Sequence, residues 1–117
     1  MDHLVNIFKL LSDETRLRII NLLSQQELCV CQLSGILDVP QPKISKNLSK
    51  LRDMNLVVGR RNEKFVFYTL KFDNLILTTT LKNILDNIGD CPQLALDKNR
   101  LVDKAIYLNQ CSIFLDK

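Results

Sequence analysis

The sequence has little glycine, proline or aromatic residue and no long apolar run. Three glycines, three prolines and seven aromatic residues in 117 exclude collagen-like, linker-like and disordered chains. They also disfavour a β-sandwich, which needs a turn every ~8–12 residues. No apolar stretch approaches the roughly 20 residues that span a membrane. The N-terminus lacks a charged region followed by an apolar one, so we expect no signal peptide and no membrane partner, in a cytoplasmic protein.

Basic residues are unevenly distributed along the chain. The formal net charge is only +3, but residues 41–64 hold seven lysines and arginines against two acids. That stretch therefore carries +5 and the rest of the chain −2. A basic block in a near-neutral protein indicates a polyanionic partner, although a merely solvated face is the alternative.

Helical spacing of apolar residues predicts a mainly α-helical protein of one domain over residues 1–117. Ser12 is the expected N-cap of the second helix, Asp73 or Asn74 that of the fifth, and Gly89 the C-cap of the fifth. The six expected helices cover about residues 2–11, 13–23, 27–37, 41–53, 74–88 and 93–109.

One segment changes from helical to strand character. Leu56–Val58 and Phe65–Leu70 are rich in β-branched and aromatic residues, which favour strands. Gly59–Lys64 lies between them, so we expect a small β-hairpin with a basic tip.

The order of these elements predicts a winged helix-turn-helix with a DNA-binding core over about residues 12–70. A short break at Pro40 separates the third helix from a fourth, polar and basic one, the expected recognition helix. The hairpin would be the wing, and double-stranded operator DNA the partner. Predicted phosphate contacts are Lys43, Lys46, Lys50, Arg60, Arg61 and Lys64, and predicted base contacts are Gln41, Ser45 and Asn47.

The fifth helix carries a long apolar stripe that could pack within the chain or against a second copy. The stripe consists of Leu77, Leu81, Ile84, Leu85 and Ile88. Because two-fold DNA readers gain affinity and site spacing from dimerisation, we expect a homodimer through helices at about 2–11 and 74–110.

Four cysteines in a chain without a secretion signal are expected to be reduced. Cys29 and Cys31 form a Cys-x-Cys pair, and their thiolates suit soft ions but not a structural zinc knuckle. On an ideal helix the two would lie about 200° apart, so a shared ion would distort the helix before the recognition helix. Alternatively, Cys29 is a buried core residue, and Cys91 and Cys111 could be core residues or ligands.

Several absences argue against an enzyme. The chain has no Cys-x-x-Cys, no glycine-rich phosphate loop and a single histidine, His3, so a thiol nucleophile has no histidine partner nearby in sequence.

Four stretches together resemble the ArsR-SmtB family of winged-helix metalloregulatory repressors, over about residues 4–90. They are Leu11–Ile19, Glu27–Leu33, Gln41–Leu48 and Phe67–Leu70. The arsenic-responsive branch is the most similar. The resemblance implies a homodimeric repressor that binds its operator when metal-free. It further implies release when trivalent arsenic or antimony occupies the thiolates near the third helix.

The sequence departs from that branch at Ser34, where a third cysteine would stand. Either Cys91 or Cys111 supplies the third sulfur, or the inducer takes two thiolates, as a methylated arsenical does. The candidate metal ligands are therefore Cys29, Cys31, Cys91 and Cys111. The resemblance disfavours a cadmium or lead site, since no cysteine precedes Cys29, and a histidine-based zinc site. The alternative function is a thiol-based redox or sulfur-responsive repressor of the same fold.

Overall fold

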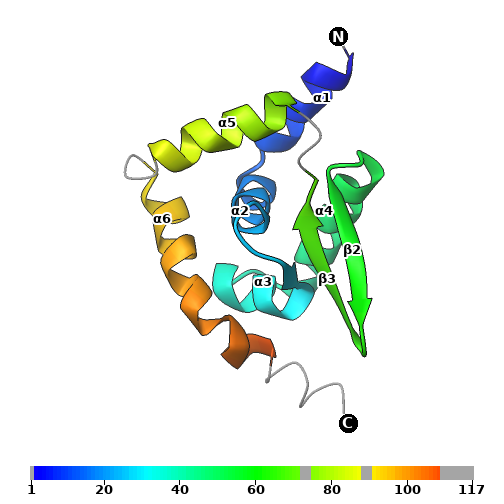
Figure 1. Cartoon of the computed structure of the whole chain (residues 1–117), viewed down its shortest axis with the longest axis vertical. Helices are drawn as coiled ribbons and strands as arrows, with labels where there is room; N and C mark the ends of the chain where they lie inside the picture. Colours follow the sequence, from blue (N-terminus) through cyan, green and yellow to red (C-terminus); the bar gives the residue numbers. More distant parts are fainter. Residues whose placement is uncertain (1, 72–74, 88–90, 109–117) are drawn as a thin grey trace.

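A small sheet lies at one edge of a group of helices in the computed structural model, which describes residues 2–71, 75–87 and 91–108 (Figure 1). Residues 104–108 are again helical after the last named element. The predicted mainly α fold with a small β-hairpin is confirmed. The elements are α1 (Asp2–Leu11), α2 (Glu14–Leu23), β1 (Leu28–Cys29), α3 (Val30–Leu37), α4 (Gln41–Asp53), β2 (Val57–Asn62), β3 (Phe65–Leu70), α5 (Leu75–Asp86), α6 (Pro92–Asn99) and the 3₁₀ helix η2 (Arg100–Asp103).

The hairpin gains a third strand that the sequence did not predict. β1 pairs antiparallel with β3, so the strand order is β1-β3-β2. Leu28 lies opposite Tyr68, and Cys29 opposite Phe67. A strand of two residues is too short to show an alternating pattern of apolar and polar residues, so β1 is recognised only by its pairing with β3.

The core lies where α2, α3 and α4 pack together. The predicted inner faces of α3 and α4 are confirmed: the side chains of Leu33, Ile36, Ile44 and Leu51 are fully buried. Each such burial contributes about 1.5–3 kcal/mol to the free energy of unfolding. This packing fixes α4 against α3 and leaves the outer face of α4 in solvent.

The apolar stripe on α5 packs inside the chain. Leu77 and Leu81 are buried, and Ile84 lies against the same core. Leu77, Leu81 and Ile84 therefore pack within the chain, and dimerisation through this helix stays a prediction. Side chains left exposed on α1 and α5 include Val5, Phe8 and Ile76. Asp73, Asn74, Ile88 and Gly89 lie outside the described residues.

Two predicted boundaries differ from the structure. The N-cap of α2 is Asp13, whose carboxylate accepts a hydrogen bond from the Arg16 backbone N–H at 3.0 Å. Ser12 instead donates its hydroxyl hydrogen to the Lys9 carbonyl at 2.6 Å. The expected helix over 93–109 is interrupted, since α6 ends at Asn99 and η2 follows.

The segment from Pro92 to residue 108 wraps around one side of the fold (Figure 1). α6 contacts α2, and η2 contacts α3. Asp97 on α6 is fully buried and accepts two hydrogen bonds from the Arg18 guanidinium, at 2.9 and 3.0 Å. This ion pair raises the pKa of Arg18. No helix within the described ranges is long and apolar enough to cross a bilayer.

Candidate inducer site and DNA-contact surface

Cys29 does not lie on a helix. It is the last residue of β1 and the N-cap of α3, with an extended backbone (φ −95°, ψ 173°). The predicted helix is therefore wrong at residues 27–29, where pairing with β3 replaces helical hydrogen bonds. An ion shared with Cys31 would not need to unwind a helix at Cys29, because Cys29 already precedes the helix.

The Cys29 thiol is shielded from solvent. Its residue is 2% exposed, and its backbone N–H donates to the Gln32 side-chain oxygen at 3.0 Å. Burial raises the pKa of the Cys29 thiol, while backbone N–H groups at the start of α3 offset part of that rise. A thiophilic ligand must therefore reach a group that is mostly protonated at neutral pH.

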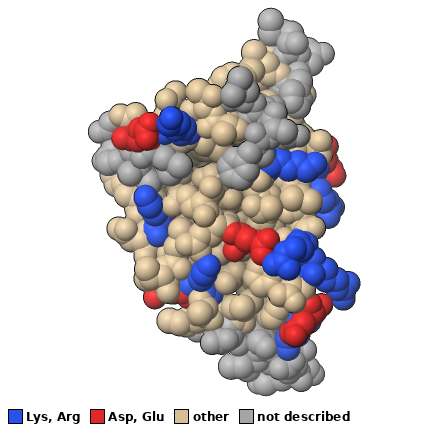
Figure 2. Space-filling view, in the orientation of Figure 1, with Lys and Arg blue, Asp and Glu red and all other residues tan. Residues whose placement is uncertain are grey.

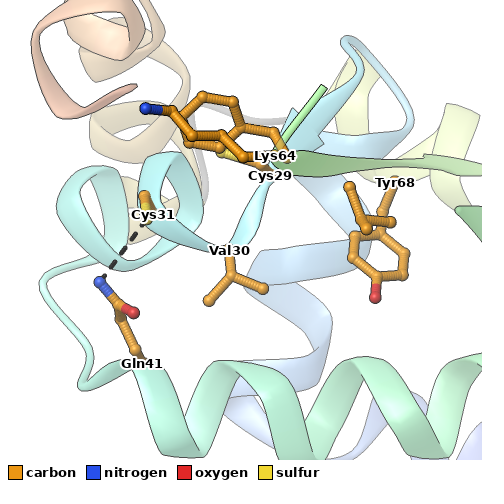
Figure 3. A pocket seen from close by; sticks show the side chains of 8 residues that line it. Cys29, Val30, Cys31, Gln41, Lys64 and Tyr68 are labelled. Carbon is orange, nitrogen blue, oxygen red and sulfur yellow. Dashed lines mark hydrogen bonds between the residues drawn. The ribbon is translucent and has the colours of Figure 1, made fainter. Parts of the chain in front are cut away.

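Cys31 lies in the first turn of α3 and is partly exposed. Its sulfur accepts a long hydrogen bond from the Gln41 side-chain amide at 3.7 Å (Figure 3). Gln41 is the first residue of α4, so this contact joins the cysteine pair to the expected recognition helix. Cys31 is disulfide-bonded in the structure, whereas Cys29 and Cys91 are free thiols.

A cavity of about 270 Å³ opens beside the two cysteines (Figure 3). Its walls come from the start of α3, the start of α4 and the wing. They are formed by Cys29, Val30, Cys31, Gln41, Lys64, Phe65, Val66 and Tyr68. The cavity gives a small ligand room next to the sulfurs, between both elements expected to touch DNA.

The other candidate ligands do not complete a three-donor site in the described residues. Cys91 is the N-cap of α6, which starts beside the end of α5, on the side away from the wing (Figure 1). The Ser34 hydroxyl donates to the Val39 carbonyl at 2.6 Å. Within residues 2–71, 75–87 and 91–108 no group of three His, Cys, Asp or Glu could hold a metal ion. Cys111 lies outside these ranges.

The outer face of α4 is polar and basic. Lysines and arginines gather over the side of the molecule that carries α4 and the wing (Figure 2). Five of the six predicted contact residues on α4 are exposed: Gln41, Lys43, Ser45, Lys46 and Lys50. This surface can lie along a phosphate backbone.

Asn47 is the exception on α4. It is 6% exposed, its amide nitrogen donates to the Lys43 carbonyl at 2.9 Å, and its oxygen accepts from Arg16 at 3.4 Å. Both ends of the amide are used inside the protein. In this structure Asn47 therefore presents no free amide group to a base edge, and its role in base contact stays a prediction.

Arg60 and Arg61 lie on β2 and not at the hairpin tip, which is formed by Glu63 and Lys64. All four residues are exposed. The hairpin prediction is confirmed, but its turn is shorter than expected. The left-handed backbone of Glu63 (φ 57°) makes the tight turn.

Arg60 already has an acidic partner. Its guanidinium donates to both Glu27 carboxylate oxygens, at 2.5 and 3.3 Å, and lies 5.9 Å from the centre of the Phe67 ring. The hydrogen bonds lower the pKa of Glu27 and raise that of Arg60. Sequence reasoning missed Glu27, because nothing in a linear pattern relates two residues 33 positions apart.

Gln32 was also missed as a site residue. Its side chain accepts from the Cys29 backbone and donates to the Lys104 carbonyl at 3.3 Å. A glutamine three residues after an N-cap is a known capping pattern and could have been found, but its second partner could not.

Known proteins are similar to this chain in sequence and in fold. The family model described as "Bacterial regulatory protein, arsR family" matches residues 13–58. The arsenical resistance operon repressor of Escherichia coli K12 is 51% identical over 67 residues, covering 56% of this chain and 57% of that protein. The chain thus spans little more than half of that relative.

Two further proteins match over more of their length. The arsenical resistance operon repressor of Staphylococcus aureus is 34% identical over 99 residues, covering 75% of this chain and 95% of that protein. The crystal structure of AntR, an antimony-specific transcriptional repressor, superposes with a TM-score of 0.66 at 25% identity, covering 79% of this chain and 82% of that one. With a winged helix-turn-helix and these relatives, the chain belongs to the ArsR family of bacterial regulatory proteins.

Proposed function

We propose that this protein is a homodimeric repressor that binds operator DNA and releases it when trivalent arsenic or antimony binds Cys29 and Cys31. The position of the pair carries the proposal. Cys29 lies opposite Phe67 of the wing, and Cys31 contacts Gln41 at the start of α4. A ligand that moves either sulfur acts directly on an element of the DNA-contact surface.

DNA binding is assigned to the exposed basic residues of α4 and the wing. Gln41 and Ser45 are the proposed base contacts. Arg60 belongs to the set once it leaves Glu27. The proposed phosphate contacts are Lys43, Lys46, Lys50, Arg60, Arg61 and Lys64.

Release follows from differential binding. In the reduced protein, a trivalent arsenic hydroxide exchanges hydroxides for thiolates and forms water, with no change of oxidation state. On this proposal, joining both sulfurs draws Cys29 out of its buried position and Cys31 away from Gln41. The ligand therefore favours a conformation with altered β1 pairing and an altered start of α4. Coupling of about 1–3 kcal/mol is typical of such linked sites.

The number of protein sulfurs that bind the inducer depends on whether a third cysteine takes part. The cavity brings together two cysteines, Cys29 and Cys31, and once reduced they fit a ligand with two exchangeable positions. A three-coordinate centre needs Cys91 or Cys111 in addition. The relatives named for arsenical resistance and antimony support the choice of a trivalent metalloid.

Dimerisation is assigned to α1 and α5. Exposed Val5 and Phe8 on α1 and Ile76 on α5 form apolar surface that a second copy would cover. A two-fold arrangement would place two copies of α4 about 34–36 Å apart, one turn of DNA.

A second candidate is a redox-responsive repressor of the same fold. The disulfide at Cys31 favours it, because oxidation alone then changes the state of a residue that contacts α4. In that case an oxidant would replace the metalloid as the signal.

Fluorescence anisotropy of a duplex from the protein's own promoter tests both candidates. The reduced repressor is titrated with arsenite, antimonite, cadmium, zinc and peroxide, with a phosphine as the reductant. Release by a trivalent metalloid that is lost in Cys29→Ser and Cys31→Ser supports the proposal, and Cys91→Ser and Cys111→Ser test whether either residue supplies a third sulfur. Loss of DNA binding itself in the first two variants would make those cysteines structural, and release only by peroxide would favour the redox candidate.

A further inference from the structure

The C-terminal segment beyond the family match is attached to the cysteine pair through one side chain. Gln32 on α3 is 4% exposed and bonds in two directions. Its oxygen accepts from the Cys29 backbone at 3.0 Å, and its nitrogen donates to the Lys104 carbonyl at 3.3 Å. Movement of Cys29 away from α3 therefore breaks a bond within a chain of contacts that ends in the C-terminal segment.

That segment, residues 92–108, is held against α3 by independent contacts, and we call it the C-terminal clasp. Arg100 donates to the Gly35 carbonyl at 2.9 Å and to the Tyr107 hydroxyl at 2.8 Å. The Tyr107 ring lies so close to Gly35 that a Cβ there would be 2.1 Å from the nearest ring carbon. Only glycine allows this approach, because overpacking would push the clasp off α3.

The far end of the clasp is anchored on α2. The buried Asp97 pairs with Arg18, whose guanidinium also donates to the Leu37 carbonyl at the end of α3 at 2.9 Å. Lys104 bonds to Gln26 in the turn before β1. The clasp thus bonds directly to α3 at Gln32 and Gly35, and it reaches the end of α3 only indirectly, through Arg18 of α2.

We infer that Gln32 is a positioning residue and that the clasp, through it, sets how easily a thiophilic ligand reaches Cys29. When the clasp is closed, the Lys104 carbonyl holds the Gln32 side chain in place. Gln32 in turn holds the backbone of Cys29, which is 2% exposed. Opened, it frees Gln32, and Cys29 samples solvent more often by local unfolding of β1. The effect on arsenic sensing depends on the proposed function, but the effect on thiol access does not.

The test measures alkylation of Cys29 by N-ethylmaleimide in the full-length reduced protein. Cys31→Ser leaves Cys29 as the only thiol in the tryptic peptide 19–43, so mass spectrometry reports its rate alone. Gln32→Met removes both hydrogen bonds at nearly constant size. Gly35→Ala displaces the clasp and favours the α3 helix itself.

Two matched controls change the same residue type or the same segment without touching these contacts. Gln25→Met alters a glutamine that bonds to the Asn21 carbonyl, and Val102→Ala alters a clasp residue that is 85% exposed. We expect Gln32→Met and Gly35→Ala to raise the alkylation rate about tenfold, as loss of a buried hydrogen bond implies, and the controls to stay within about twofold.

Wild-type rates in both variants, with unchanged circular dichroism, would overturn the inference. Faster alkylation in Gln32→Met but not in Gly35→Ala would overturn the part played by the clasp. If Gly35→Ala does not fold, Arg100→Met removes two clasp contacts without overpacking and replaces it.

A second readout separates this inference from the proposed function. In chains that keep Cys31, the arsenite concentration for half-release of operator DNA should fall by a similar factor, with DNA affinity unchanged. If arsenite releases no DNA from any variant, but alkylation of Cys29 is still faster in Gln32→Met and Gly35→Ala, the proposed function is wrong and the inference about the clasp is supported.

Discussion

Arg18 and Arg60 each pair with a carboxylate far away in the sequence, but in different surroundings. Arg18 bonds to Asp97 with side-chain exposures of 13% and 0%, and joins α2 to the C-terminal clasp. Arg60 bonds to Glu27 with exposures of 59% and 36%, and joins the wing to the segment before β1. Both pairs have two guanidinium–carboxylate hydrogen bonds.

The difference distinguishes two regions: α2 with the C-terminal clasp, joined by a buried ion pair, and the wing, joined to the segment before β1 by an exposed one. A buried carboxylate without its partner is costly, so the Arg18 pair anchors the α6 end of the clasp on α2. An exposed pair contributes little to stability, so Arg60 can exchange Glu27 for a phosphate. Cys29 lies between these two regions, paired with β3 of the wing and directly before α3.

Removing Asp97 should have the largest effect. Asp97→Ala leaves Arg18 without its carboxylate and should lower the free energy of unfolding by about 2–4 kcal/mol, measured by urea denaturation. Asp97→Asn keeps a hydrogen-bond acceptor and should cost less. Asp86→Ala, on the exposed side of α5, is the control. A cost for Asp97→Ala equal to that of the control would remove the distinction between the two pairs.

Reversing a charge on the outer face of α4 comes next. Lys46→Glu should weaken operator binding by roughly 10–100-fold near 0.15 M salt and flatten the dependence of affinity on salt, with stability unchanged. Anisotropy titrations at several salt concentrations measure both quantities. Lys82→Glu on α5 makes the same charge change away from this face. Equal losses in both variants would mean that net charge alone decides affinity.

The pH dependence of the alkylation rate of Cys29 tests how well its thiol is shielded between the wing and α3. Because burial raises the pKa of this thiol, the thiolate fraction should grow tenfold per pH unit between pH 6 and 8. The rate should keep rising where a free cysteine, of pKa ~8.5, begins to level off. The protonated thiol is the form favoured by folding, so its stabilising contribution is present at lower pH and is lost as the pH rises through the raised pKa. A plateau at or below that of free cysteine would show that the thiol is not shielded.

Releasing Arg60 should have the smallest effect. Glu27→Gln removes the carboxylate and should strengthen operator binding a few-fold at low salt, because Arg60 then meets phosphate without competition. The melting temperature should not change, since the pair is exposed. Glu14→Gln on α2 is the matched control. Weaker binding would show that Glu27 holds the wing in its DNA-binding position.

Local sequence patterns predicted those features of the fold that depend on residues close together in the chain. The inner faces of α3 and α4 and the hairpin follow from apolar spacing and β-branched composition, and the structure has them where expected. Asn47 and β1 show the limit. Asn47 has the position of an outward polar residue, yet Arg16, 31 residues away, bonds to it inside the protein.

The sequence alone determined the class of the fold, the basic block of residues 41–64 and the close spacing of Cys29 and Cys31, because each depends on residues adjacent in the chain. The tertiary structure decided what those residues face. It placed Cys29 on a strand and not on a helix, bound Arg60 to Glu27, and joined Gln32 to a clasp 72 positions away. These outcomes follow from burial and from hydrogen bonds between distant segments, whose energies no local pattern contains.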